Sequence, residues 1–275
     1  MKFEWIPSIA TGKRSLLSAL GLAILPALFA LATLAQGQTY SVLYTFPNPT
    51  DGSEPQGVIR DAAGNLYGAT YNGGAHSGGA IFKLTPSGKE TVLYSFGAYA
   101  GDGSGPVSVV GDAAGNLYGT TLSGGSDCST GYSPHNCGTI FKLDPSGHET
   151  ILHNFGGSGD GALPETGVVE DAAGNLYGTT GAGGDYKCNN QYYGCGTIFK
   201  LNSKGKYTVL YEFKDGSDGL GPNGLTLDAA GNLYGTAEGG DQVPSGIVFK
   251  LSPTGESPFF TPSLAEPTAV CPPEL

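Results

Sequence analysis

The sequence predicts an all-β protein, a β-propeller of four-stranded antiparallel blades in which the N-terminal strand closes a ring of four blades. Three observations lead to this fold class. The 275 residues include 47 glycines and 18 prolines, which cost about 1 and 3 kcal/mol in helix interiors, so long helices beyond the N-terminus are disfavoured. The octapeptide Asp-Ala-Ala-Gly-Asn-Leu-Tyr-Gly occurs four times, and further strand-like segments recur in phase with it.

Residues 1–35 are typical of an export signal and are expected to lie outside the fold. A pair of basic residues precedes the apolar run 16–32, which is followed by small residues of the kind that signal peptidases accept. We therefore expect cleavage after Ala35 or Gly37 and an exported protein, located outside the cell, on its surface or in the periplasm. The alternative is a retained anchor, because the apolar run is nearly long enough to span a bilayer.

The charge balance disfavours a nucleic-acid partner. The chain has 13 basic and 24 acidic residues and a net charge of −11. Removal of residues 1–35 takes away three basic residues and one acidic residue, which leaves about −13. Such a surface repels phosphate backbones and anionic lipids. No second long apolar run follows, so we expect no membrane insertion after cleavage, and a monomer.

Each repeat within residues 38–256 is expected to form four short strands separated by turns. In the first repeat these strands are 57–60, 66–70, 81–84 and 91–96. The Asp-Ala-Ala-Gly-Asn and Pro-Ser-Gly segments between them are rich in turn-forming residues. Four strands in a repeat of roughly 50 residues is typical of a propeller blade, whereas the repeat of a β-helix is much shorter.

The number of strands allows the ring to close. The fourth repeat ends in prolines instead of a fourth strand, and an extra copy of that strand, residues 41–46, precedes the first repeat. If this segment fills the vacancy, four complete blades leave no exposed edge. The alternative is a truncated member of a larger propeller. The tail 257–275 contains five prolines and no strand rhythm, so we expect it to be disordered.

The repeat resembles the GloVer-type tandem repeat over roughly residues 39–256. The resemblance rests on the motifs Asp-Gly-x-x-Pro, Gly-Asn-Leu-Tyr-Gly-Thr-Thr, Gly-Gly, Gly-Thr-Ile-Phe-Lys-Leu and Ser-Gly. It implies an exported bacterial protein with a propeller-like fold, and it brings no established reaction and no catalytic residues. The chain shows no recognisable C-terminal anchor of the kind that members of this family carry.

Two long loops between the second and third strands of their repeats are bracketed by cysteines. In an exported chain we expect disulfides between Cys128 and Cys137 and between Cys188 and Cys195. A zinc site is disfavoured, because one histidine beside two cysteines falls short of four ligands. A fifth cysteine, Cys271, lies in the tail.

The same loops carry the side chains that we expect to contact a ligand, namely Tyr132, His135, Tyr186, Tyr192 and Tyr193. Tyrosine offers rigid, amphipathic contact area, and the neighbouring Asn and Gln side chains can donate and accept hydrogen bonds. This combination suits a glycan or a protein ligand. The alternative is that the disulfides stiffen long loops and the tyrosines cover neighbouring backbone.

An Asp-Gly pair in the loop before each repeat offers a candidate metal site. The four aspartates are Asp51, Asp102, Asp160 and Asp218. In a closed ring they would converge near the axis and hold a hard cation such as Ca²⁺, the one cofactor considered. The alternative is that each is satisfied within its own turn and faces water.

Two further sets of repeated residues are expected to be structural. They are the lysines of the third strands and the tyrosines of the second strands: Lys83, Lys142, Lys200 and Lys250, and Tyr67, Tyr118, Tyr177 and Tyr234. A fixed position in every blade favours packing, or pairing with an acid, over cofactor binding.

The sequence shows no catalytic motif: it has no Gly-x-Ser-x-Gly elbow, no His-Glu-x-x-His helix and no P-loop. None of the histidines has an evident partner for general-base chemistry, and His153 takes a position that other repeats fill with Tyr. We therefore expect an exported, non-catalytic recognition or surface module. The alternatives are a propeller hydrolase or lyase acting on a glycan or lactone with a central cation, and a structural spacer without a ligand.

Overall fold

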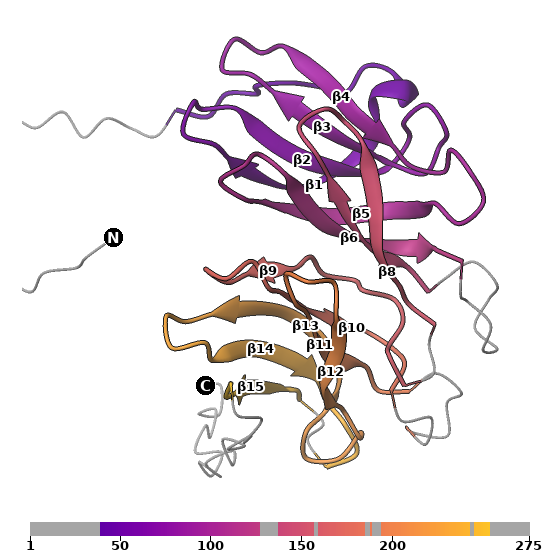
Figure 1. Ribbon diagram of the computed structural model, residues 1–275, viewed down its shortest axis with the longest axis vertical. Coiled ribbons are helices and arrows are strands. Elements are labelled where there is room, and N and C mark those ends of the chain that lie inside the picture. The colour runs from indigo at the N-terminus through magenta and orange to yellow at the C-terminus, as the bar shows by residue number, and fades with distance from the viewer. Residues whose placement is uncertain are drawn as a thin grey trace, which may run out of the picture. The chain divides into compact units, whose positions relative to one another are not determined.

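The computed structural model describes residues 39–126, 137–156, 159–184, 188, 194–242 and 245–253, and Figure 1 traces them. The chain divides into two units, Met1–Val42 and Leu43–Leu275, and every strand belongs to the second. The described residues form fifteen strands and a single 3-10 turn, η1 (Pro49–Asp51). The predicted fold class is confirmed: the protein is all-β, with four antiparallel sheets as the blades of a four-bladed propeller.

The blades follow one another along the chain, and within each sheet consecutive strands are hydrogen-bonded neighbours. Blade one contains β1 (Ser53–Arg60), β2 (Leu66–Asn72), β3 (Ala80–Leu84) and β4 (Glu90–Ser95). Blade two contains β5 (Gly103–Gly111), β6 (Leu117–Gly124), β7 (Thr139–Leu143) and β8 (Glu149–Asn154). Blade three contains β9 (Val169–Glu170), β10 (Leu176–Thr180), β11 (Thr197–Leu201) and β12 (Tyr207–Glu212). Blade four contains β13 (Leu220–Leu227), β14 (Leu233–Glu238) and β15 (Ile247–Leu251).

The turn between the first two strands of each blade is closed by its own side chains. In blade four, Asp228 Oδ1 accepts the N–H groups of Ala230 and Asn232, at 2.9 and 2.8 Å. Its Oδ2 accepts the Asn232 amide at 2.7 Å and the Tyr234 hydroxyl at 3.1 Å. The Lys250 ammonium lies 5.4 Å from the centroid of the Tyr234 ring, at a distance that favours a cation–π contact.

The other three blades repeat this arrangement around Asp61, Asp112 and Asp171. The glycine of each turn has a positive φ, 83° at Gly231 for example, which residues with a Cβ rarely adopt. The repeated lysines and tyrosines therefore support the turns, which is a structural role of the kind that the sequence predicts.

The blades pack on one another through pairs of phenylalanines. The phenylalanine that ends the fourth strand segment of one repeat meets the third-strand phenylalanine of the next blade edge to face. The ring centroids are 5.0 Å apart for Phe96 and Phe141, and 5.4 Å apart for both Phe155–Phe199 and Phe213–Phe249. The core is thus built between blades as well as within them.

Blade four differs from the sequence prediction. Within the part of the chain that the structure describes, β15 is bonded to β14 alone, and residues 41–46 form no strand. Val248 on β15 is 70 % exposed, whereas Ile81, Ile140 and Ile198 at the same repeat position are 0–1 % exposed. Phe46 packs on Phe82 of blade one, with ring centroids 5.2 Å apart, as the corresponding phenylalanines of the other repeats pack on the next blade. The segment thus keeps this contact between repeats, although no ladder joins it to β15.

The expected export signal, residues 1–35, and the expected disordered tail, residues 257–275, lie outside the described residues. Among the residues that are described, no helix has the length and hydrophobicity needed to cross a membrane.

Candidate functional site

The disulfide between Cys188 and Cys195 is present, which confirms that pairing. The two Cα atoms are 5.5 Å apart and both side chains are buried. Cys137 is also disulfide-bonded, and its expected partner Cys128 lies outside the described residues. The predicted ligand-contacting side chains lie outside them as well, so their role stays a prediction; they are Tyr132, His135, Tyr186, Tyr192 and Tyr193.

The four Asp-Gly aspartates close the loops that precede their blades. Asp102 Oδ2 accepts the N–H groups of Gly97 and Ala98, at 2.8 and 2.9 Å, and the Tyr94 hydroxyl at 3.3 Å. Asp218 Oδ2 accepts the Lys214 N–H at 3.0 Å and the Tyr211 hydroxyl at 2.9 Å.

The remaining two aspartates behave in the same way. Asp51 accepts the Asn48 amide at 3.2 Å, and Asp160 accepts the N–H of Gly156 at 3.1 Å. Across the described ranges, no group of three or more His, Cys, Asp or Glu side chains is placed to hold a metal ion. Within the described residues the structure does not gather these carboxylates around one cation. Each is hydrogen-bonded within its own loop, and Asp102 and Asp218 are buried, 5 % exposed, whereas the alternative had them face water.

The segment that precedes an Asp-Gly loop supplies a partner for its aspartate, and blade two departs from the rule. Tyr94 and Tyr211 hydrogen-bond to their aspartates with a phenol. Blade two has His153 at this position, and its Nε2 lies 3.2 Å from Asp160 Oδ2. In the described part of the chain, this is the one contact within 4.0 Å between a basic and an acidic side chain, and the His and Asp side chains are 19 % and 27 % exposed.

A second departure from the repeat lies against the first. Tyr207, at the start of β12, takes the position of Glu90 in β4 and Glu149 in β8. Its ring stacks on that of His153, with centroids 3.8 Å apart and an angle of 4° between the planes. The Tyr207 hydroxyl donates to the backbone carbonyl of Asp160. Burial raises the pKa of Tyr207 far above its usual range, so this residue remains a neutral phenol.

This arrangement fixes the imidazole in both position and tautomer. An ionised carboxylate can only accept a hydrogen bond, so the Nε2 atom of His153 carries the proton and donates it to Asp160. In the neutral ring that donates from Nε2, the lone pair is on Nδ1. A histidine oriented by a carboxylate is a recurrent general base in enzymes.

The base of the Cys137 loop borders the pair. The N–H of Leu163, three residues beyond Asp160, donates to the Cys137 carbonyl at 3.2 Å. Ser126, just before the loop, donates its N–H to the side chain of Asn154 at 3.1 Å, next to His153. Ser126 and Cys137, which flank this loop, therefore bond to residues within three positions of His153 or Asp160 in the sequence.

The interpretation that none of the histidines has a partner is therefore wrong for His153. The partner lies seven residues away across a loop, and neither residue belongs to a known catalytic motif. The available signal was the repeat itself, because His153 stands where three other copies of the segment have Tyr.

The model of the Gloeobacter/Verrucomicrobia repeat family matches residues 26–188 and 127–262. No curated protein matches the sequence. Among solved structures, the chain is similar to a gluconolactonase from Xanthomonas campestris, with 17 % identity and a TM-score of 0.45, covering 74 % of this chain and 60 % of that one. It is similar to the PQQ-bound aldose sugar dehydrogenase from Streptomyces coelicolor, with 16 % identity, a TM-score of 0.43, and coverage of 69 % and 57 %. A luciferin-regenerating enzyme gives 14 % identity, a TM-score of 0.44, and coverage of 72 % and 58 %.

The chain spans about six tenths of the length of these solved structures. At such identities the likeness is one of fold, and none of the three activities is carried over. All three are nevertheless enzymes, and this finding contradicts the prediction of a non-catalytic recognition or surface module. That prediction is corrected here.

Proposed function

The chain belongs to the Gloeobacter/Verrucomicrobia repeat family, and we propose that the junction between two of its repeats is the active site of an exported hydrolase. His153 is the general base of this site, Asp160 orients it, and the substrate is an uncharged lactone or ester. The observation that carries the proposal is the His153–Asp160 pair, which forms where blade two departs from the other repeats.

Comparison of the repeats separates the residues that every blade needs for its fold from those that only one blade has. A residue that recurs in every blade is explained by the blade, as the Asp, Asn, Tyr and Lys of the turns are. His153 and Tyr207 do not recur, and yet the two rings stack on each other beside Asp160. His153 and Tyr207 both differ from the other repeats and contact each other. This favours a functional site, because exceptions to the rules of a fold cluster at such sites.

The chemistry follows from the tautomer. His153 Nδ1 takes a proton from water while the water oxygen attacks the carbonyl carbon of the substrate. Asp160 stabilises the imidazolium that forms. When the tetrahedral intermediate collapses, the carbon–oxygen bond to the leaving alkoxide breaks and the imidazolium returns its proton to that oxygen. The products are a carboxylic acid and an alcohol, or a hydroxy acid when the substrate is a lactone.

Charge and residue type narrow the substrate class. A net charge of −11 repels polyanions such as uronate polymers and phosphate esters. Glycoside hydrolysis commonly uses two free carboxyl groups, whereas Asp160 is already bound by its own loop and by His153. These points favour an uncharged lactone or ester over a glycan. The Cys188–Cys195 disulfide and the export signal that the sequence predicts for residues 1–35 favour a location outside the cytoplasm.

The test uses the residue that the other repeats supply. In His153→Tyr, the new phenol has the hydrogen bond to aspartate seen for Tyr94 and Tyr211, at 3.3 and 2.9 Å, so the fold is expected to stay intact. Loss of the general base should lower the hydrolysis rate by about 10²- to 10⁴-fold. His148→Tyr, the same change at an exposed turn, is the control.

The assay is hydrolysis of a panel of aliphatic lactones and p-nitrophenyl esters by the full chain, produced in an oxidising compartment. Wild type and His148→Tyr should be equally active, and His153→Tyr should be inactive with a Tm within about 4 °C of wild type. Two results would sink the proposal: no hydrolysis by the wild type above buffer, or full activity of His153→Tyr. A wild-type protein without hydrolase activity would favour the alternative of a structural spacer without a ligand.

A further inference from the structure

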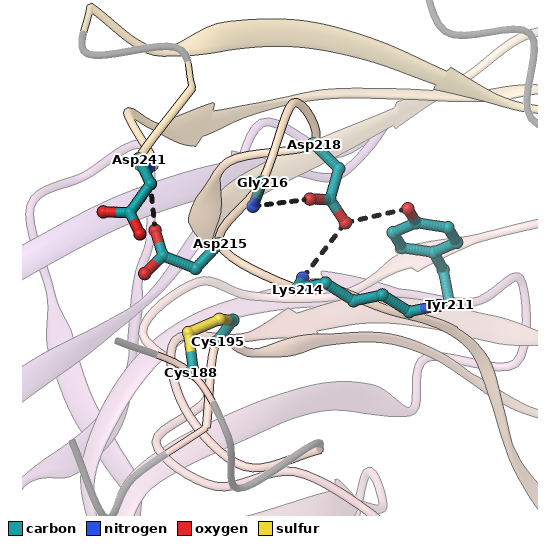
Figure 2. The surroundings of a disulfide bond; sticks show 8 residues. All are labelled: Cys188, Cys195, Tyr211, Lys214, Asp215, Gly216, Asp218 and Asp241. Carbon is teal, nitrogen blue, oxygen red and sulfur yellow. Dashed lines mark hydrogen bonds between the residues drawn. A yellow bond between two sulfur atoms is a disulfide. The ribbon is translucent and has the colours of Figure 1, made fainter. Parts of the chain in front are cut away.

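Asp215, in the loop that leads from β12 to β13, is a buried carboxylate with an unsatisfied oxygen. The residue is 6 % exposed, and its backbone has a φ of 58°, in the left-handed region that non-glycine residues rarely adopt. Oδ1 accepts the N–H of Asp241 at 3.2 Å, as Figure 2 shows. Oδ2 is covered and has no hydrogen-bond partner.

The other deeply buried aspartates of the described chain are different. Both oxygens of Asp102 and of Asp218 accept hydrogen bonds from their own loops. Glu90 and Glu149 each have one unsatisfied oxygen as well, but their side chains are only partly buried. Asp215 is therefore the one carboxylate in the described residues that is both nine-tenths buried and half unsatisfied.

Within the described residues, no Lys, Arg or His nitrogen lies within 4.0 Å of the Asp215 carboxylate, and the one contact of that kind is between His153 and Asp160. Lys214 precedes Asp215 in the sequence, but in Figure 2 its side chain extends toward Tyr211. Burying an uncompensated carboxylate is unfavourable, so such groups are paired, protonated or bound to a metal.

Two oxygen atoms of this loop border Gly240. A Cβ atom added to Gly240 would lie 2.8 Å from Asp215 Oδ1 and 2.9 Å from the carbonyl oxygen of Gly216. The next residue, Asp241, also bonds to the backbone carbonyl of Asp215 with its N–H, at 3.2 Å. Two carboxylates and two backbone carbonyls thus belong to residues that contact one another.

We propose that this loop pair binds Ca²⁺, with Asp215 Oδ2 and the Asp241 carboxylate as its charged ligands. Ca²⁺ takes six to eight oxygen ligands in flexible geometry, and backbone carbonyls and water supply those that carboxylates do not. The site has two acidic side chains and is therefore smaller than a cluster of three His, Cys, Asp or Glu side chains, of which the described residues contain none. Mg²⁺ fits less well, because it demands a near-ideal octahedron.

The ion has a mechanical consequence. It ties the loop of residues 214–219 to that of residues 239–242, beside the Cys188–Cys195 disulfide (Figure 2). Among the described residues, blade four has three strands and each other blade has four. We therefore expect an ion that links two of its loops to stabilise this blade more than it would any other. The site does not depend on the proposed hydrolase activity, because it lies at another junction of the repeats.

The experiment measures Ca²⁺ binding and thermal stability on the full chain. The protein is washed with chelator, and Ca²⁺ is then titrated while Tm and bound ⁴⁵Ca are recorded. At a Ca²⁺ concentration 100-fold above Kd, Tm should rise by about 5–10 °C, with one ion bound per chain. Asp215→Asn should lose both the rise in Tm and the binding. The control is Glu238→Gln, which removes one charge from an exposed position of the same blade and should behave as wild type.

Each outcome either supports or overturns the proposed Ca²⁺ site. Saturable binding by wild type and Glu238→Gln, but not by Asp215→Asn, supports the site. Absence of binding in the wild type overturns it, and so does binding that persists in Asp215→Asn. If Asp215→Asn does not fold, Asp241→Asn takes its place; its affinity for Ca²⁺ must fall at least tenfold, and an unchanged affinity overturns the proposal.

Discussion

Val248 and Ile140 occupy the same place in two blades and should respond very differently to truncation. Each lies on the third strand of its blade, one residue before the phenylalanine that packs on the preceding repeat. Ile140 is covered by β8 and is 0 % exposed, whereas Val248 is 70 % exposed. The substitutions are Ile140→Ala and Val248→Ala.

The magnitudes follow from the burial of the two side chains. Ile→Ala in a closed core costs about 2–5 kcal/mol, because the loss of apolar burial is added to that of a cavity. Val248→Ala removes two carbon atoms, each worth about 0.8 kcal/mol when fully buried. Since three tenths of Val248 is covered, the expected cost is about 0.5 kcal/mol. For a domain of this size, each kcal/mol lowers Tm by roughly 2–4 °C.

The assay is urea unfolding followed by far-UV circular dichroism, with the m-value compared between variants. An unchanged m-value shows that the midpoint reports stability alone. A cost of 2 kcal/mol or more for Val248→Ala would refute the reasoning, because it would mean that another strand covers β15 in solution. A cost below 1 kcal/mol for Ile140→Ala would also refute the reasoning, because it would mean that Ile140 is not enclosed in a packed core.

Three further predictions concern the disulfide and two carboxyl groups. Cys188→Ala with Cys195→Ala should lower the free energy of unfolding by about 2.4 kcal/mol, from the loop entropy of a separation of 7 residues; a denaturation curve identical to wild type would contradict this. Hydrogen bonds from Asn232 lower the pKa of Asp228 to about 2 from 3.8. Its stabilisation is therefore present above pH 4 and lost as pH falls toward 2, so Asp228→Asn should flatten the stability–pH curve in that range, and an unchanged slope would contradict the assignment. Burial and the nearby Asp102 raise the pKa of Glu149 above 4.5. Stability from this group is full below pH 4.5 and lost as pH rises through the folded pKa. Glu149→Gln should accordingly match wild type at pH 4 and exceed its stability at pH 7, and lower stability at pH 7 would exclude this account.

The blades could be predicted from the sequence because their hydrogen bonds are local. In each turn the aspartate binds an asparagine four residues later and a tyrosine six residues later, so one octapeptide contains the whole arrangement. The edge of blade four could not be predicted in this way. Residues 41–46 and β15 lie some 200 residues apart in the sequence. Both segments have a strand-like sequence whether or not they pair, so the sequence does not decide the pairing.

The candidate sites show the same limit. The Cys188–Cys195 pairing could be predicted, because seven residues separate the two cysteines within one loop. The His153–Asp160–Tyr207 group is assembled from β8, a loop and β12, and no sequence rule brings Tyr207 to a histidine 54 residues before it. Asp215 depends in turn on Asp241, 26 residues later. Its left-handed backbone carries no sequence signal, because aspartate is common in ordinary turns.

The self-contained turn also bears on how such a chain evolves. Because each Asp-Asn-Tyr-Lys set is completed inside one repeat, duplication of a repeat copies a finished structural unit that needs no compensating change elsewhere. The phenylalanine contact supplies the same coupling to whichever repeat follows. Copy number can therefore change by whole units, and a single residue such as His153 can make one junction different while the other repeats have tyrosine.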